Sequence, residues 1–178
     1  FFFMGNDYSP SIPSIYKFDI LFDEILPMYR NFGKYLSKVD SKTQTIKLDY
    51  ENFFLFSQLF SEKEITWLKM KNLEQNSYFP DPVFSNVFED NLITTDKLKK
   101  IYYDKYFPNQ TKDKIVSYYC YNLENILNMF FYHKMNWCIF FPFYHSPFLQ
   151  DLNVKPKFDI KLFNDIYPMD CCFNLLTI

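Results

Sequence analysis

The segment Lys112–His133 reads K-D-K-I-V-S-Y-Y-C-Y-N-L-E-N-I-L-N-M-F-F-Y-H. Its apolar residues recur every three or four positions, which is the period of an α-helix. A helix that is apolar over most of its circumference is normally buried. The segment is therefore predicted to be the central helix of the fold. Its first stripe contains Ile115, Tyr119, Leu123, Ile126 and Phe130, and a second stripe of Val116, Cys120, Leu127 and Phe131 widens it.

Two weaker helical patterns lie earlier in the chain. Between residues 20 and 36 apolar residues recur at helical spacing, Pro27 predicts a kink or a division into two short helices, and Gly33 predicts a C-terminal cap. A second helix is predicted over residues 50–70, with Asp49 as its N-cap.

The remaining segments divide into one further helix and three irregular stretches. Residues 95–106 are predicted to be helical, with Thr95 as the cap. Polar residues 37–45 and the proline-containing stretch 76–91 are predicted to be loops. The aromatic run 137–147, which prolines interrupt twice, is predicted to be extended or looped chain packed on the central helix.

Composition fits one domain with a large aromatic core. The chain has 178 residues, 48% of them hydrophobic, with 23 Phe, 15 Tyr and no Ala. Its net charge of −2 argues against a protein that coats nucleic acid nonspecifically, but is compatible with a nuclease, whose metal site is acidic. No apolar stretch reaches the roughly 18 residues of a membrane span. The chain begins without an initiator Met, so we expect it to be a fragment of a longer protein.

The four cysteines show no zinc-binding spacing. We expect buried, reduced thiols and an intracellular protein, with the cytoplasm and the nucleus equally compatible. They are Cys120, Cys138, Cys171 and Cys172.

The opening residues are the first candidate for chemistry. Residues 1–4 are apolar and are predicted to form a buried strand, which Gly5 ends in a turn that presents Asp7. A carboxylate in this position could bind Mg²⁺ or Mn²⁺, because hard cations prefer oxygen ligands, and Asn6 could donate a supporting hydrogen bond. A plain turn, with Asp7 capping the next element, explains the same residues.

The histidines and the aromatic run are the second candidate. His133 ends the central helix and His145 lies in the aromatic run, and neither has a catalytic partner at recognisable spacing, so both are interpreted as structural. Five aromatic side chains of the run could stack on nucleobases, although core packing is the ordinary role of such residues. They are Trp137, Phe140, Phe141, Phe143 and Tyr144.

Two stretches resemble one known family. Met4–Pro13 (M-G-N-D-Y-S-P-S-I-P) resembles the G-N-D-F-x-P-x-x-P element of the Xrn family of 5′→3′ exoribonucleases, and also the G-x-D-Y segment of flap endonucleases. Trp137–Leu152 (W-C-I-F-F-P-F-Y-H-S-P-F-L-Q-D-L) resembles the Xrn run W-x-W-Y-Y-P-Y-H-Y-A-P-F-x-S-D, which flap endonucleases lack. The order Tyr144-His145 reverses the family's His-Tyr, so no role is transferred to His145.

Shorter pieces between and after these stretches agree in order. The piece Gly33–Leu36 resembles G-G-Y-L, and Ile46–Leu48 with Phe53 and Phe54 resembles I-N-L-x-x-F. Further along, Tyr102–Phe107 resembles Y-Y-x-x-K-F, and Phe163–Pro168 resembles F-E-Q-L-M-x-V-L-P with a shorter spacing.

The resemblance implies a mostly α segment of an α/β PIN/flap-nuclease-like catalytic core, made of the last core strand and the helices of the family's second conserved region. Residues 1–36 would end the first conserved region, and residues 37–178 would form the helical part of the second. The activity implied is processive hydrolysis of RNA carrying a 5′-monophosphate, by two-metal-ion catalysis with Mg²⁺ or Mn²⁺ and Asp7 as one ligand.

The other ligands implied by the resemblance lie upstream, so that part of the same nuclease core is an expected partner, and no membrane is. Asn6, Trp137, Tyr144 and His145 would support the site or the RNA groove. Two alternatives stay open: a degenerate, non-catalytic Xrn-like interaction protein, and a flap-type DNA nuclease.

Overall fold

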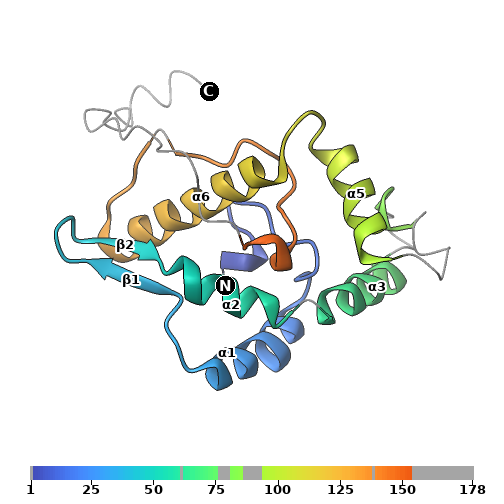
Figure 1. Cartoon of the computed structure of the whole chain (residues 1–178), viewed down its shortest axis with the longest axis horizontal. Helices are drawn as coiled ribbons and strands as arrows, with labels where there is room; N and C mark the ends of the chain where they lie inside the picture. Colours follow the sequence, from blue (N-terminus) through green and yellow to red (C-terminus); the bar gives the residue numbers. More distant parts are fainter. Residues whose placement is uncertain (1, 61, 76–80, 86–93, 138, 154–178) are drawn as a thin grey trace.

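A computed structural model describes residues 2–60, 62–75, 81–85, 94–137 and 139–153. Helix α6 (Lys112–Tyr132) runs through the middle of the molecule, and the other elements lie around it (Figure 1). It begins at Thr111, whose hydroxyl accepts a hydrogen bond from the Lys114 N–H, and ends at His133 in the left-handed conformation with φ 54°. The predicted central helix is confirmed. No helix in the described ranges is long and apolar enough to cross a membrane.

The other elements are short. Pro27 lies in the first turn of α1, where its missing N–H is tolerated, and Gly33 ends α1 with φ 66°, so the predicted cap is confirmed. The chain passes from η2 into α1 without leaving the helical conformation, so the division or kink at Pro27 stays a prediction. In chain order the elements are the 3-10 helix η1 (Phe2–Met4), the π-helix η2 (Ile20–Ile25), α1 (Leu26–Phe32), the strands β1 (Ser37–Asp40) and β2 (Thr45–Leu48), α2 (Tyr50–Gln58), α3 (Lys63–Gln75), α5 (Thr95–Tyr106), α6 and the 3-10 helix η3 (Leu149–Asp151).

The predicted N-terminal strand is wrong. Residues 2–4 form η1 and are only half-buried. The Gly5 N–H donates to the Phe2 carbonyl at 3.3 Å, so the chain turns back before it can extend. Within the described ranges the one sheet is the antiparallel pair β1–β2, and it does not include residues 2–4. Membership of a PIN-like sheet stays a prediction.

The predicted loop at residues 37–45 is also wrong, because β1 and β2 form a hairpin. Ser37 pairs with Leu48 and the register runs to Asp40 opposite Thr45. The Asp40 carboxylate accepts a hydrogen bond from the Lys42 N–H at 2.9 Å within the turn, and this bond lowers the pKa of Asp40.

Side chains of α6 satisfy the outer edge of β2. The Asn128 amide accepts from the Ile46 N–H at 2.7 Å and donates to the Ile46 carbonyl at 2.9 Å. The Glu124 carboxylate accepts from the Leu48 N–H at 2.8 Å. These bonds fix the hairpin against α6. They are tertiary contacts, which the polar character of residues 37–45 does not reveal.

The predicted helix at residues 50–70 is present as two helices. Asp49 caps α2 as predicted, by accepting from the Asn52 N–H at 3.2 Å. Helix α2 ends at Gln58, and the next helix, α3, begins at Lys63. Phe56 and Phe60 meet edge to face across this break, with ring centroids 4.9 Å apart, and both side chains are buried. At α5 the cap is Thr94, one residue before the predicted Thr95.

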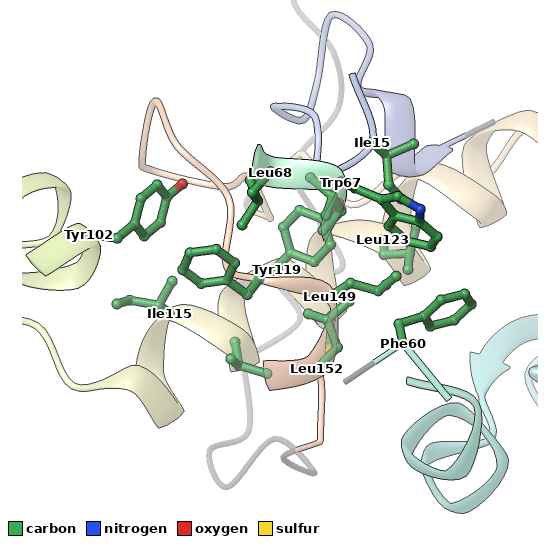
Figure 2. Close-up of a cluster of buried hydrophobic side chains, with 14 of the residues drawn as sticks. Ile15, Phe60, Trp67, Leu68, Tyr102, Ile115, Tyr119, Leu123, Leu149 and Leu152 are labelled. Atoms are coloured by element: carbon green, nitrogen blue, oxygen red, sulfur yellow. The ribbon is translucent and has the colours of Figure 1, made fainter. Parts of the chain in front are cut away.

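One hydrophobic core joins α3, α5, α6 and η3. Figure 2 shows side chains from these elements converging between the helices. Burial of each such side chain stabilises the fold by roughly 1.5–3 kcal/mol. The labelled core residues are Ile15, Phe60, Trp67, Leu68, Tyr102, Ile115, Tyr119, Leu123, Leu149 and Leu152, and the predicted buried thiol of Cys120 belongs to the same cluster. The other three cysteines and Phe163–Pro168 lie outside the described residues.

In its described residues, 137 and 139–148, the aromatic run returns along α6 without regular structure, as predicted. Phe141 packs edge to face on Tyr119 with centroids 5.4 Å apart, and Phe143 lies against Tyr118 at 6.3 Å. Increasing residue numbers in the run thus contact decreasing numbers in α6. The run and the helix are antiparallel, as their traces in Figure 1 also indicate.

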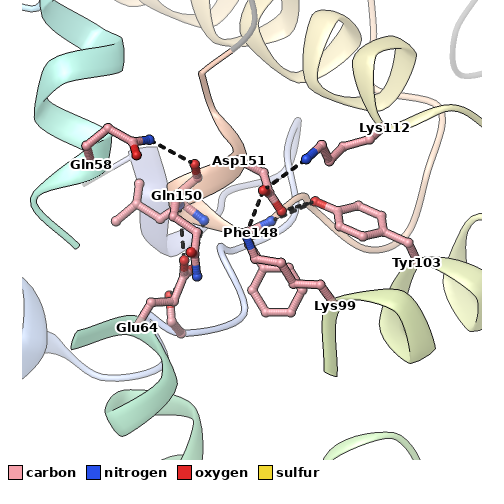
Figure 3. A network of polar contacts seen from close by, with 10 residues as sticks. Gln58, Glu64, Lys99, Tyr103, Lys112, Phe148, Gln150 and Asp151 are labelled. Atoms are coloured by element: carbon pink, nitrogen blue, oxygen red, sulfur yellow. Dashed lines mark hydrogen bonds and ion pairs between the residues drawn. The ribbon is translucent and has the colours of Figure 1, made fainter. Parts of the chain in front are cut away.

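Two buried carboxylates hold the end of this run (Figure 3). Fully buried Glu64 accepts from the N–H groups of Leu149 and Gln150 at 2.8 and 3.0 Å, and from the Ser14 hydroxyl at 2.8 Å, so it caps η3. Burial raises the pKa of Glu64. The second carboxylate, Asp151, accepts from Lys99 at 2.7 Å, from Tyr103 at 3.0 Å and from Lys112 at 3.4 Å.

We expect Glu64→Gln to lower the free energy of unfolding by about 2–3 kcal/mol, because the new NH₂ group faces a backbone N–H. The exposed Glu62→Gln is the matched control and should stay within about 0.5 kcal/mol.

The loss of unfolding free energy in Glu64→Gln should depend on pH. Because the pKa of Glu64 is raised in the folded state, its neutral form stabilises the fold below the unfolded pKa, and that contribution falls as the pH rises through the folded pKa. Gln does not titrate, so the difference between wild type and Glu64→Gln should be larger near pH 4 than near pH 8. Urea unfolding at both values measures it, and a difference that grows with pH contradicts the raised pKa.

Candidate functional site

The predicted Asp7 segment is a tight turn closed by backbone and side-chain hydrogen bonds. Asn6 and Ser9 exchange backbone bonds of 2.9 and 3.2 Å, which places Asp7 and Tyr8 at the tip. The Asn6 side chain accepts from the Tyr8 N–H at 2.8 Å, as in an Asx turn. Asp7 is exposed. Asn6 therefore shapes the turn that presents the Asp7 carboxylate.

Gly5 is required at the base of this turn. Its φ is 84°, in the left-handed region that favours glycine. A Cβ at this position would lie 2.7 Å from the backbone nitrogen of Ser11, which is too close for any side chain. The Ile12 N–H donates to the Phe3 carbonyl at 2.8 Å and holds the two arms of the turn together.

Two asparagines of α6 bring the Asp7 turn and the start of the aromatic run together. Buried Asn122 donates to the Tyr8 carbonyl at 2.9 Å. Buried Asn125 donates to the carbonyls of Asn136 and Ile139 at 3.0 and 3.2 Å and accepts from the Asn136 N–H at 2.7 Å. Positions three apart are neighbours on a helix surface. Neighbouring side chains of α6 therefore bind the turn and the loop that carries Trp137.

Trp137 is the predicted aromatic residue that follows Asn136 in the loop bound by Asn125. Its side chain is 49% exposed, and Phe140, three residues on, is 65% exposed. Both offer ring faces to a ligand, whereas Phe141 and Phe143 pack inward against α6. Of the aromatic residues predicted to stack on bases, Trp137 and Phe140 are therefore exposed, whereas Phe141 and Phe143 pack against α6.

The second half of the run meets the N-terminal segment at a different point. The Ser146 hydroxyl donates to the Ser11 carbonyl at 2.6 Å, and the Tyr102 hydroxyl donates to the Ser146 carbonyl at 2.8 Å. The segments that carry the family resemblance are therefore in direct contact, although Ser11 and Ser146 are 135 residues apart in sequence.

Tyr144 and His145 contribute no contact to the Asp7 turn. Tyr144 is 96% exposed. The His145 ring stacks on Tyr106 of α5, with centroids 3.8 Å apart. Burial lowers the pKa of His145, although the nearby Asp81 opposes the shift. The His145 ring thus packs against α5 and not against the Asp7 turn.

The described residues supply one carboxylate for a metal rather than a complete set. Among them no group of three or more His, Cys, Asp or Glu side chains could hold an ion. Asp7 suits the role of one oxygen ligand, because its carboxylate is exposed and no hydrogen bond or ion pair within the described ranges occupies it. A two-metal site would need further carboxylates from outside the described ranges.

Sequence reasoning missed Asn122, Asn125 and Ser146. The signal was present for the first two, because polar amides at helical spacing on an otherwise apolar helix must find buried hydrogen-bond partners. No such pattern marks Ser146. No family model matches the chain, and no significant match was found among the curated proteins.

We expect Gly5→Ala to lower the free energy of unfolding by about 3 kcal/mol or more, because it combines a positive φ with a backbone clash. Gly33→Ala is the control, since it shares the positive φ but its nearest atom is 3.9 Å away, and it should cost about 1 kcal/mol. Urea unfolding of both variants compares them. Equal losses would show that the close approach to Ser11 is relieved by local movement.

Proposed function

We propose that this chain is part of an Xrn-like 5′→3′ exoribonuclease that acts on 5′-monophosphorylated RNA, and that Asp7 is one of its metal ligands. The proposal is supported by the two asparagines of α6, of which Asn122 binds the Asp7 turn and Asn125, three residues on, binds the loop of Trp137. An exposed carboxylate and an exposed aromatic ring, carried by segments that bind neighbouring positions of one helix, suit a ligand that combines phosphate-bound metal with unpaired bases.

In the proposed enzyme, Mg²⁺ or Mn²⁺ would activate water and stabilise the leaving oxygen. The residues of this chain have supporting tasks. Asp7 presents its carboxylate from a turn that Gly5 and Asn6 shape. Trp137 offers a ring face for base stacking. His145, which stacks on Tyr106 of α5, would buttress the groove from the α5 side, and the exposed ring of Tyr144 would be available to RNA.

One observation favours the interaction protein as a second candidate. Three large aromatic side chains are exposed around the end of α6, namely Phe130 at 54%, Phe131 at 65% and Phe140 at 65%. Exposed aromatic residues of this kind are typical of surfaces that contact another protein or another part of the same protein. In the exoribonuclease they would face the rest of the catalytic core.

We expect Asp7→Ala in the full-length protein to abolish Mg²⁺-dependent degradation of 5′-phosphorylated RNA, while changing the free energy of unfolding by less than about 1 kcal/mol. Asp104→Ala, an exposed carboxylate on α5, is the control and should retain full turnover. Unchanged turnover in Asp7→Ala would reject the ligand assignment.

The same assay separates the three candidate functions. Degradation of 5′-phosphorylated RNA supports the exoribonuclease, preference for flap DNA supports the DNA nuclease, and no turnover on either substrate supports the interaction protein.

We expect Trp137→Ala to weaken binding of 5′-phosphorylated single-stranded RNA about tenfold, since stacking of one base on an aromatic ring contributes ~1–3 kcal/mol. Fluorescence anisotropy without Mg²⁺ measures the dissociation constant. Tyr35→Ala is the control, because Tyr35 is 83% exposed and lies between α1 and β1. Equal RNA affinities of both variants and the wild type would show that Trp137 does not contact RNA.

A further inference from the structure

We propose that Asn122 is a positioning residue for Asp7, through its hydrogen bond to the carbonyl of Tyr8. This inference rests on the proposed function, and it names a residue that the motif resemblance does not include. Asn122 lies in the middle of α6, is 2% exposed, and donates from Nδ2 to the Tyr8 carbonyl at 2.9 Å.

The bond acts on the residue next to Asp7. The backbone of the turn is closed within itself by the Asn6–Ser9 pair, so it can move as a unit unless something outside anchors it. The hydrogen bond from Asn122 anchors the tip of the turn to α6. Removing the Asn122 amide leaves the Tyr8 carbonyl without this hydrogen bond. The carboxylate of the neighbouring Asp7 is then no longer held in one direction.

The same helix, α6, also packs against the turn through an apolar side chain. Tyr119, one helical turn before Asn122, is 1% exposed, and its hydroxyl lies near the Ser9 side chain without a hydrogen bond of ordinary geometry. Phe141 of the aromatic run packs on the Tyr119 ring with centroids 5.4 Å apart. The turn thus has an apolar support that resists inward movement, and the bond from Asn122 is what sets its position along α6.

Asn128 provides a matched control. It has the same side chain, lies on the same helix, is 8% exposed and also binds backbone groups, but its partners belong to Ile46 and to α6 itself. Asn128→Ala should cost at least as much stability as Asn122→Ala, since it loses more hydrogen bonds. A purely structural role for Asn122 therefore predicts no defect that Asn128→Ala lacks.

The experiment uses the full-length protein and three readouts. In Asn122→Ala the Mg²⁺ concentration for half-maximal RNA degradation, and the Mn²⁺ dissociation constant measured by electron paramagnetic resonance, should each rise about tenfold. Turnover at saturating Mg²⁺ should stay within about twofold of wild type, because removal of a supporting group weakens the ligand without deleting it. Backbone amides of the turn should exchange hydrogen faster without metal. Asn128→Ala should change none of these readouts.

Asn122→Ser, which keeps a shorter donor, takes the place of Asn122→Ala if that variant does not fold. Equal behaviour of the Asn122 and Asn128 variants in all three readouts overturns the positioning role. Asp7→Ala distinguishes this result from failure of the proposed function: if Asp7→Ala keeps wild-type Mn²⁺ affinity and turnover, the ligand assignment itself is wrong. If Asp7→Ala loses both Mn²⁺ affinity and turnover, and Asn122→Ala loses neither of them, only the positioning role is wrong.

Discussion

The structure depends on buried amide groups along one helix. Three asparagines of α6 bind the backbone of three segments that are distant in sequence: Asn122 the Asp7 turn, Asn125 the loop after α6, and Asn128 the edge of β2. Each such bond contributes about 1 kcal/mol net, but leaving a buried partner unpaired costs more, about 1–3 kcal/mol. The amides therefore specify which segment lies where, while the aromatic core supplies most of the stabilisation.

Buried carboxylates play the same organising role at the other contacts. Glu124 binds the Leu48 N–H, and its neighbour Tyr50 donates a hydroxyl bond to it at 3.0 Å. Glu64 caps η3 and thereby fixes the end of the aromatic run beside the N-terminal segment. A chain with irregular segments this long needs polar anchors, because the backbone groups of loops have no ladder or helix to satisfy them. Anchors of this kind also keep an exposed residue such as Asp7 in a defined place.

The sequence predicted the helices better than the strands, for a physical reason. The apolar period of residues 112–133 and the caps at Asp49 and Gly33 are local signals, and all three were confirmed. The hairpin at Ser37–Leu48 was missed because its strands have only four residues each, and its position depends on hydrogen bonds between α6 side chains and the backbone of Ile46 and Leu48, which no local pattern records. The expected strand at residues 1–4 was wrong because Gly5 turns the chain at once and leaves no extended length to pair.

By itself, the sequence determined the central helix, the aromatic core and the Gly5–Asp7 turn, because helical period, apolar composition and glycine conformation act over a few neighbouring residues. The tertiary structure alone decided that α6 binds both this turn and the loop of Trp137, that Ser11 meets Ser146, and that the His145 ring packs on Tyr106 of α5. Those outcomes depend on hydrogen bonds and ring contacts between residues far apart in the chain. Such contacts form only when α6 places its polar groups in the core, where each one must find a partner.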